Sequence, residues 1–198
     1  MKNITLASKS VDRKKLFERA KLNFEIFITN IDEQSYMNRI PDPIELVKQL
    51  AKAKSNFAKK QLIKAEKDSI IVAADTIVEL NGEIIGKAQD EEEAFLILKK
   101  LSSNEHSLIT GIAVTETFNP KMVVDHERTV VKFLPLEEEE IWSYIDLGEW
   151  KGRAGAYSIR EKASLFIEYI RGSPSNVIGL PMERLFKILR DEFHVSLL

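Results

Sequence analysis

The segment that most constrains the fold is an uninterrupted apolar run in the first half of the chain. Ile70-Ile71-Val72-Ala73-Ala74 lies within an expected strand, Ser69–Leu80, and contains no polar residue. Such a run is typical of a strand that is buried on both faces of an α/β sheet. Asn81-Gly82 follows at once and predicts a two-residue hairpin turn into residues 83–85.

Strand-like and helix-like segments alternate along the rest of the chain. This alternation, together with the hairpin, predicts an α/β domain with a mixed sheet. A length of 198 residues fits a single domain with a sizeable core. The expected strands are residues 4–7, 24–29, 107–117, 122–134 and 165–170, and the expected helices are 12–20, one opened by Pro43, 91–101, one after Glu137–Glu140 and one opened by Pro181.

Composition and charge exclude several classes of protein. The 29 Lys and Arg residues nearly balance the 31 Asp and Glu residues, which is unlike a duplex-binding protein. The absence of cysteine excludes disulfides, thiolate zinc sites and a cysteine nucleophile. The chain has neither a signal-peptide core nor a run of about 20 apolar residues. We therefore expect a cytoplasmic protein with no membrane or nucleic-acid partner.

Histidine chemistry and a metal site on the acidic run are both disfavoured. The three histidines lie far apart without ligand spacing, which argues against a histidine metal site or a Ser-His-Asp triad. The four glutamates Glu137–Glu140 precede a helical pattern. They are best interpreted as an acidic first turn that complements the helix dipole.

The first candidate for chemistry is the junction between the first strand and the first helix. Ser8 and Ser10 precede the helix, and Arg13 lies in its first turn. Free N–H groups at a helix start, two hydroxyls and an arginine fork can satisfy phosphate oxygens. The alternative is a serine N-cap followed by a solvated basic face.

The second candidate is Asp75, which follows the apolar run directly. A carboxylate among such apolar residues needs a cation, a metal ion or good donors, so Asp75 either lies at an open strand end or has a partner. Glu33, Lys54 and Lys87 are isolated charged candidates, and each taken alone is more often a solvated surface charge.

Fragments spread along almost the whole chain resemble, in order, the Maf family of nucleoside triphosphate pyrophosphatases. Residues 6–13 resemble the family's Leu-Ala-Ser-x-Ser-x-x-Arg signature, and residues 152–159 resemble its Gly-Lys-Ala-Gly-x-Tyr-x-Ile segment. The other matching fragments are Ile31-Asp32-Glu33, residues 50–54, Ala74-Asp75-Thr76, Gly86-Lys87, Leu101-Ser102, Thr110-Gly111, Ala113-Val114 and residues 177–181.

The resemblance implies a fold and a reaction. The fold would be a two-lobed α/β structure with a long twisted mixed sheet flanked by helices, similar to the inosine triphosphate pyrophosphatases. Residues 1–198 would form one domain with a central nucleotide cleft, usually as a homodimer. The reaction would convert a nucleoside triphosphate and water into the monophosphate and pyrophosphate, with Mg²⁺ or Mn²⁺ as cofactor.

The resemblance also implies roles for individual residues. Asp75 would accept a proton from the attacking water, and Glu33 with Asp75 would hold the metal ion. Arg13, Lys54 and Lys87 would contact the triphosphate, and Ser8 or Ser10 would supply hydroxyl donors.

The chain departs from the family pattern at three places. Val11-Asp12 stands where the family usually has Pro and Arg, Arg153 where it has Lys, and Arg160 where it has Gln. Asp12, Arg160 and Thr76 match positions where the family is thought to choose its base. We expect Asp12 and Arg160 to lie near the base or each other. Since a carboxylate accepts from the ring N–H and amino donors of guanine, the preference should move away from thymine and uracil.

Two other functions stay open at this point. One is a pyrophosphatase for deaminated purine triphosphates on the same fold. The other is a catalytically weak nucleotide-sensing regulator of cell division. Asp75, Glu33 and the cationic residues are all present, which favours an enzyme.

Overall fold

The computed structural model describes residues 2–198, which form two compact units. Unit 1 contains residues 2–75, 110–127 and 179–198. Unit 2 contains residues 76–109 and 128–178. None of the helices within the described residues is long and apolar enough to cross a membrane.

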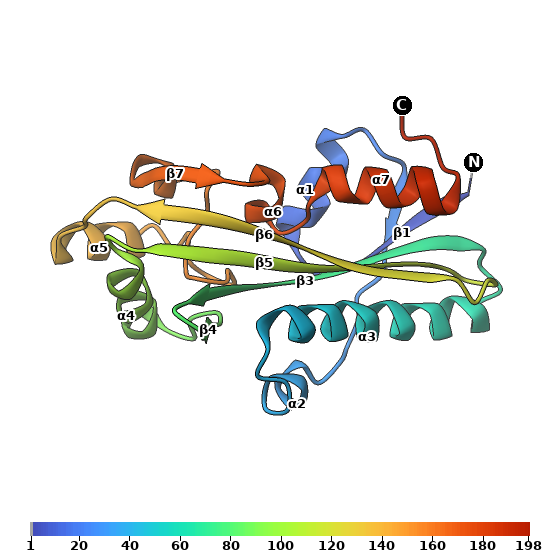
Figure 1. The fold of residues 1–198 in the computed structure, drawn as a ribbon, viewed down its shortest axis with the longest axis horizontal. Coiled ribbons are helices and arrows are strands. Elements are labelled where there is room, and N and C mark those ends of the chain that lie inside the picture. The colour runs from blue at the N-terminus through green and yellow to red at the C-terminus, as the bar shows by residue number, and fades with distance from the viewer. Residues whose placement is uncertain (1) are drawn as a thin grey trace. The chain divides into compact units, whose positions relative to one another are not determined.

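A mixed sheet with helices beside it confirms the expected fold class (Figure 1). The strand order is β2-β1-β3-β5-β6-β7, and β4 pairs with β3. β1 pairs in parallel with β2 and β3, whereas the pairs β3–β4 and β6–β7 are antiparallel. The strands are β1 Asn3–Ala7, β2 Phe24–Ile26, β3 Ser69–Leu80, β4 Glu83–Ile85, β5 Glu105–Glu116, β6 Met122–Phe133 and β7 Ile167–Arg171.

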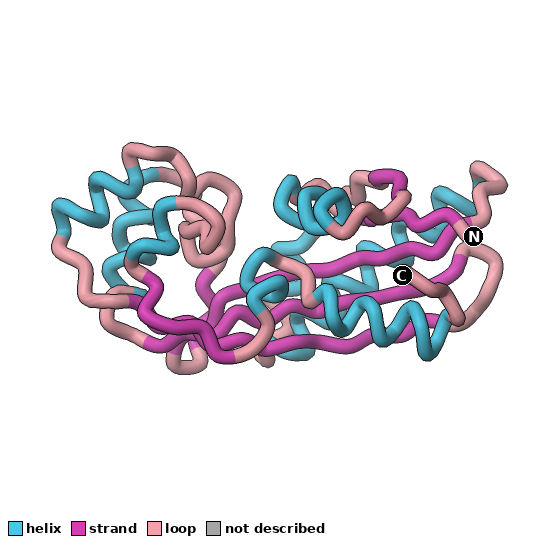
Figure 2. Tube along the Cα trace, turned by 90° about the horizontal axis from the view of Figure 1, so that it is seen from above, coloured by secondary structure: helices cyan, strands magenta, loops and turns pink. Residues whose placement is uncertain are grey.

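Helices and loops flank these strands (Figure 2). Four of the helices within the described residues begin after a side chain that caps them, namely Ser10, Asp32, Asp42 and Asp90. The helices are α1 Val11–Arg19, α2 Glu33–Met37, α3 Pro43–Lys64, α4 Glu91–Leu101, α5 Glu138–Ile145, α6 Pro174–Ile178 and α7 Met182–Phe193, with a 3₁₀ turn at Lys162–Leu165.

The long elements lie where periodicity predicts them, and the short ones differ. The Asn81-Gly82 turn has φ values of 52° and 85°, which suit the two-residue hairpin that joins β3 to β4. Helix α2 lies between residues 30 and 41, where no helix or strand was expected, and it begins where the Asp32 side chain accepts a hydrogen bond from the Ser35 N–H. The last strand begins at Ile167, because a 3₁₀ turn precedes it.

The four glutamates form the start of α5, as expected. Glu137 precedes the helix, and its backbone N–H donates to the Glu140 side chain at 2.9 Å. Within residues 2–198, no group of three or more His, Cys, Asp or Glu residues is arranged to hold a metal ion.

In unit 1, helix α3 packs directly against β5 through a glycine. A Cβ atom on Gly111 would lie 2.2 Å from the carbonyl oxygen of Val47, so only glycine permits this approach of the two backbones. Buried side chains of α3, β1 and β3 complete this part of the core, namely Ala7, Ala58, Leu62, Ile71 and Ala73. The position of α3 on the sheet is therefore tightly determined.

In unit 2, aromatic rings fill much of the core. His106 on β5 is buried, makes edge contacts with the rings of Phe133 and Tyr157, and its Nε2 lies 3.0 Å from the Tyr157 hydroxyl oxygen. The Tyr144 hydroxyl accepts a hydrogen bond from the Ser158 N–H at 3.1 Å. These contacts fasten the loop around Tyr157 to the sheet and to α5.

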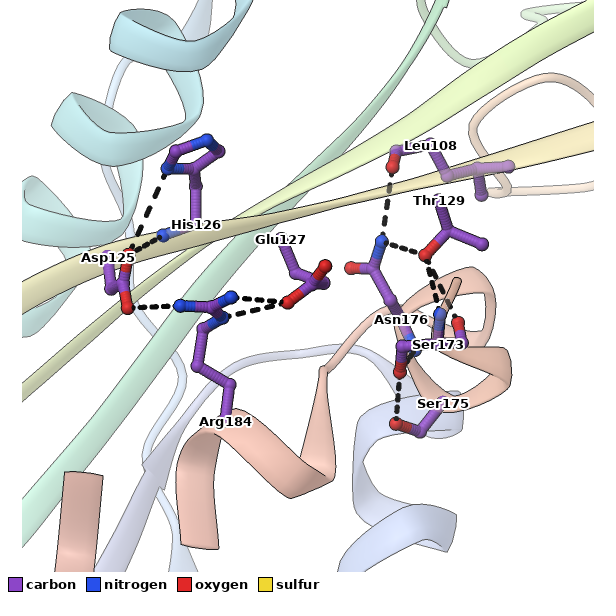
Figure 3. A network of polar contacts seen from close by, with 9 residues as sticks. All are labelled: Leu108, Asp125, His126, Glu127, Thr129, Ser173, Ser175, Asn176 and Arg184. Carbon is purple, nitrogen blue, oxygen red and sulfur yellow. Dashed lines mark hydrogen bonds and ion pairs between the residues drawn. The ribbon is translucent and has the colours of Figure 1, made fainter. Parts of the chain in front are cut away.

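Buried and half-buried polar groups fasten the C-terminal helices, and Figure 3 shows both sets. In unit 1, Arg184 on α7 forms ion pairs with Asp125 at 2.6 Å and Glu127 at 2.7 Å on β6. In unit 2, Asn176 on α6 donates to the Leu108 carbonyl at 3.1 Å and the Thr129 hydroxyl at 3.0 Å. Each set gives hydrogen-bond or ion-pair partners to polar groups whose burial without a partner would be unfavourable.

Candidate functional site

The turn between β1 and α1 holds its two serines in defined positions. Ser10 is the N-cap of α1, and its hydroxyl accepts from the Arg13 N–H at 3.4 Å. The Ser8 hydroxyl accepts from the Ser10 N–H at 3.1 Å and from Arg13 Nη1 at 3.3 Å. Asp12 is half-buried in the first turn, where a negative charge complements the helix dipole. The serine N-cap and the inward-turned arginine are therefore present together in this turn.

Arg13 turns inward rather than onto a solvated basic face. Its side chain is 8% exposed, and its Nε donates to the carbonyl oxygen of Gly179 at 2.7 Å. Burial lowers the pKa of Arg13, and the negative charges of Asp75 and Glu33 oppose this change. The guanidinium stays charged, since arginine does not deprotonate in proteins. Arg13 is thus a buried cation within the field of both carboxylates.

Lys54 joins the two candidate carboxylates through its ammonium group. Lys54 Nζ lies 2.5 Å from Asp75 Oδ1 and 2.9 Å from Glu33 Oε1. Lys54 is 7% exposed, because it lies on the buried stripe of α3 one turn after Leu50 and one turn before Ala58. The structure therefore brings together three candidates that are far apart in the sequence.

The position of Asp75 differs from one of the two alternatives that the sequence left open. Asp75 does not end the strand, because β3 continues to Leu80. It is 8% exposed and has a partner, Lys54. The burial of a carboxylate within a strand is thus offset by an ion pair. Thr76 follows on β3 and points to the opposite face, since successive side chains of a strand alternate.

Glu33 is the more accessible of the two carboxylates. It is the first residue of α2, and its side chain is 37% exposed, compared with 11% for the Asp75 side chain. Because Lys54 contacts both, the two carboxylates present oxygen atoms to one shared position.

Lys87 and Arg160 belong to unit 2. Lys87 is exposed after Gly86, and its backbone forms an isolated antiparallel bridge with Ala154. Arg160 is half-buried and follows the segment anchored by Tyr157. Arg153, a departure from the family pattern, donates from its Nε to the Glu149 carbonyl oxygen at 2.7 Å.

One contributor to this arrangement could not be recognised in the sequence. It is the Gly179 carbonyl, which accepts a hydrogen bond from Arg13 across 166 positions of sequence. Gly179 has a φ of 117°, a backbone conformation that favours glycine. The signal for the glycine in the sequence was the family-like segment at residues 177–181. His106, for which the sequence disfavours a metal-ligand or triad role, is a buried core residue of unit 2 beside Tyr157.

The donor set of unit 1 fits a hard divalent ion that also binds phosphate. Mg²⁺ is usually held by one or two carboxylates together with substrate phosphates, rather than by a cage of protein ligands. Glu33 and Asp75 are two carboxylates that already share one cation, Lys54. Arg13 and Lys54 add positive charge for a polyanion. This combination is suited to stabilising negative charge on phosphate oxygens.

Comparison with known proteins agrees with the motifs along the whole chain. A family model described as "Maf-like protein" matches residues 3–192. A protein of Thermoanaerobacter sp. (strain X514) named "dTTP/UTP pyrophosphatase" is 40% identical over 195 residues, which cover 98% of this chain and 99% of that protein. Proteins with the same name from Alkaliphilus oremlandii and Caldanaerobacter subterraneus subsp. tengcongensis are 42% and 43% identical. The first match covers 100% of both chains, and the second covers 98% of this chain and 90% of the relative.

A solved structure from Mycobacterium abscessus described as "Nucleoside-triphosphatase / dITP/XTP pyrophosphatase" also matches. Its TM-score is 0.35 and its sequence identity 12%, over 66% of this chain and 72% of that chain. So small a similarity carries no argument about the activity.

Proposed function

The chain belongs to the Maf family, and from that membership we propose that it hydrolyses dTTP and UTP with the help of a divalent metal ion. It is a nucleoside triphosphate pyrophosphatase, the activity that relatives about 40% identical over nearly the full chain carry in their names. The products of that activity are a nucleoside monophosphate and pyrophosphate. The observation that most supports the catalytic part of the proposal is the contact of Lys54 with both Glu33 and Asp75, beside buried Arg13.

In the proposed reaction, positive side chains first neutralise the triphosphate. Arg13 and Lys54 donate hydrogen bonds to phosphate oxygens, and the Ser8 or Ser10 hydroxyl assists at the start of α1. Arg13 is held for this role by the Gly179 carbonyl and the Ser8 hydroxyl, which fix the plane of the guanidinium. The family resemblance alone supports a phosphate contact for Lys87 and a part in the choice of base for Arg160 and Thr76.

Asp75 then takes the proton from the water that attacks the α-phosphorus. Its carboxylate is poised for this role because it is held on a rigid, buried strand. The bond from the α-phosphorus to its bridging oxygen breaks, and pyrophosphate leaves. Glu33 and Asp75 would hold the divalent ion, which supplies further positive charge to the phosphates when it is bound.

Asp75→Asn separates an enzyme from a nucleotide sensor. We expect pyrophosphate release in the presence of Mg²⁺ to fall by about 10² to 10⁴, the usual contribution of a general base, while nucleotide binding persists. The matched control is Asp68→Asn, an exposed carboxylate just before β3, which should leave turnover unchanged. Wild-type protein that binds nucleotide tightly without releasing pyrophosphate would instead support the sensor.

The preferred base is tested with a panel of nucleoside triphosphates. The names of the relatives support dTTP and UTP, whereas Asp12 predicts a shift toward guanine. A higher kcat/KM for dTTP and UTP than for GTP or methylated guanine nucleotides would support the proposed substrates. The opposite order, reversed in Asp12→Asn, would refute them in favour of the role predicted for Asp12. High activity on dITP or XTP would indicate a pyrophosphatase for deaminated purines.

Three further properties of the protein are part of the proposal. A homodimer, a cytoplasmic location and one nucleotide site for the whole chain are supported by the family resemblance. Sedimentation of the purified protein tests the first property, and the stoichiometry of nucleotide binding per chain tests the third.

A further inference from the structure

Lys54 forms ion pairs with Glu33 and Asp75, the two carboxylates that the proposed reaction also requires to hold the metal ion. Its Nζ contacts Asp75 Oδ1 at 2.5 Å and Glu33 Oε1 at 2.9 Å. An ammonium group has three N–H donors, and these contacts use two of them. Both carboxylates therefore already have a cation before any metal ion arrives.

We propose that Lys54 competes with the divalent ion for Glu33 and Asp75, so that the protein binds the ion tightly only together with a triphosphate. This inference rests on the proposed function, because it takes the two carboxylates as the metal ligands. It assigns Lys54 a positioning role in addition to any contact with the phosphates.

The balance of charge among the four grouped residues supports the competition. Arg13 and Lys54 carry two positive charges, and Asp75 and Glu33 carry two negative charges. A divalent ion added alone would leave two uncompensated positive charges among groups of which Arg13, Lys54 and Asp75 are less than 9% exposed. Uncompensated charge in a buried setting is strongly unfavourable. The ion alone is therefore poorly tolerated.

A triphosphate removes that difficulty in two ways. Its oxygens offset the added positive charge, and they offer the Lys54 ammonium a new set of acceptors. The lysine side chain can make this change at its end, since four flexible carbon bonds separate the ammonium from the backbone. The stem of Lys54 can remain packed on α3 between Leu50 and Ala58.

Binding of Mn²⁺ to the full-length protein tests the proposal without turnover. The signal of free Mn²⁺ in electron paramagnetic resonance disappears when the ion binds, and the measurement needs no nucleotide. We expect Lys54→Gln to bind Mn²⁺ about tenfold more tightly than the wild type, within the usual range of coupling between two ligands. The gain should disappear in the double variant with Asp75→Asn.

The matched control is Lys52→Gln on the same helix, which removes an exposed charge and leaves the contacts of Lys54 intact. An equal gain in Lys52→Gln would overturn the proposal, because the effect would then come from overall charge. Unchanged or weaker Mn²⁺ binding in Lys54→Gln would also overturn it.

A second measurement covers the possibility that Lys54→Gln is poorly folded. Lys54→Met keeps much of the side-chain volume, and the rise of its melting temperature on addition of Mn²⁺ should exceed that of the wild type. An equal rise would contradict the competition. Failure of the proposed function has a different readout, since wild-type protein would then release no pyrophosphate from any nucleotide whatever the Mn²⁺ affinities of the variants.

Discussion

Lowering the pH from about 7 to about 5 should destabilise the protein through His106. Burial lowers the pKa of His106 to about 4, and a hydrogen bond with the backbone of Asn104 opposes that change. In the unfolded chain the same imidazole has an ordinary pKa near 6.5. The unfolded state therefore takes up a proton over a pH range in which the folded state does not, and the free energy of unfolding falls as the pH falls.

The two pKa values give the size of the effect. The contribution of His106 is fully present above pH 6.5 and is lost as the pH falls toward 4. The loss is about 2 kcal/mol by pH 5 and about 3 kcal/mol once both states are protonated. Folded domains have a total stability of only about 5 to 15 kcal/mol, so a loss of this size is easily measured.

Urea unfolding followed by tryptophan fluorescence can measure the change, because Trp142 and Trp150 lie in the same unit as His106. His106→Gln replaces the imidazole with a neutral amide that can still bond the Tyr157 hydroxyl. The stability of this variant should change by about 2 kcal/mol less than that of the wild type between pH 7 and pH 5. His126→Gln, a half-exposed histidine on β6, serves as the control.

The result that would refute this reasoning is an equal pH dependence in wild type and His106→Gln. The His106 ring signals in nuclear magnetic resonance give an independent check, since they should still report a neutral imidazole at pH 5. A charged ring at that pH would show that burial does not exclude the proton.

Three further outcomes are expected from contacts in the two units. Arg13→Lys should lower kcat/KM at least about tenfold, because a point charge cannot reproduce the bonds to Gly179 and Ser8, and steady-state kinetics measure this. Gly111→Ala should cost about 1 to 3 kcal/mol in urea unfolding, since the added methyl group meets the backbone of Val47; unchanged stability would contradict the close approach. Asn176→Leu should lower the melting temperature, because the Thr129 hydroxyl and the Leu108 carbonyl lose a buried donor, and Ser175→Ala provides a milder comparison.

The sequence predicted the long elements well, because their signals are local. The apolar run at Ile70–Ala74 and the Asn81-Gly82 turn led to β3 and β4 with correct ends. The short helices α2 and α6 were missed, since five residues carry too little periodicity to be recognised. The cap of α2 depends on a single bond from the Ser35 N–H to Asp32.

The sequence pointed to the residues that the structure groups around Lys54, but it could not give their geometry. Lys54 could have been placed on the buried face of its helix, because it is four residues from Leu50 and from Ala58. Its simultaneous contact with Glu33 and Asp75 joins three separate elements, which no local pattern encodes. The bond from Arg13 to Gly179 is likewise a product of the tertiary fold.

The backbone approach of Gly111 to Val47 has a consequence for how the protein can vary. Where two main chains touch, no side chain lies between them that mutation could enlarge or trim. The distance between α3 and β5 is thus insensitive to most substitutions in the neighbouring core. The same holds for the position of Lys54 on α3. Sequence drift can therefore remodel the surrounding loops while Lys54 keeps its place beside Asp75.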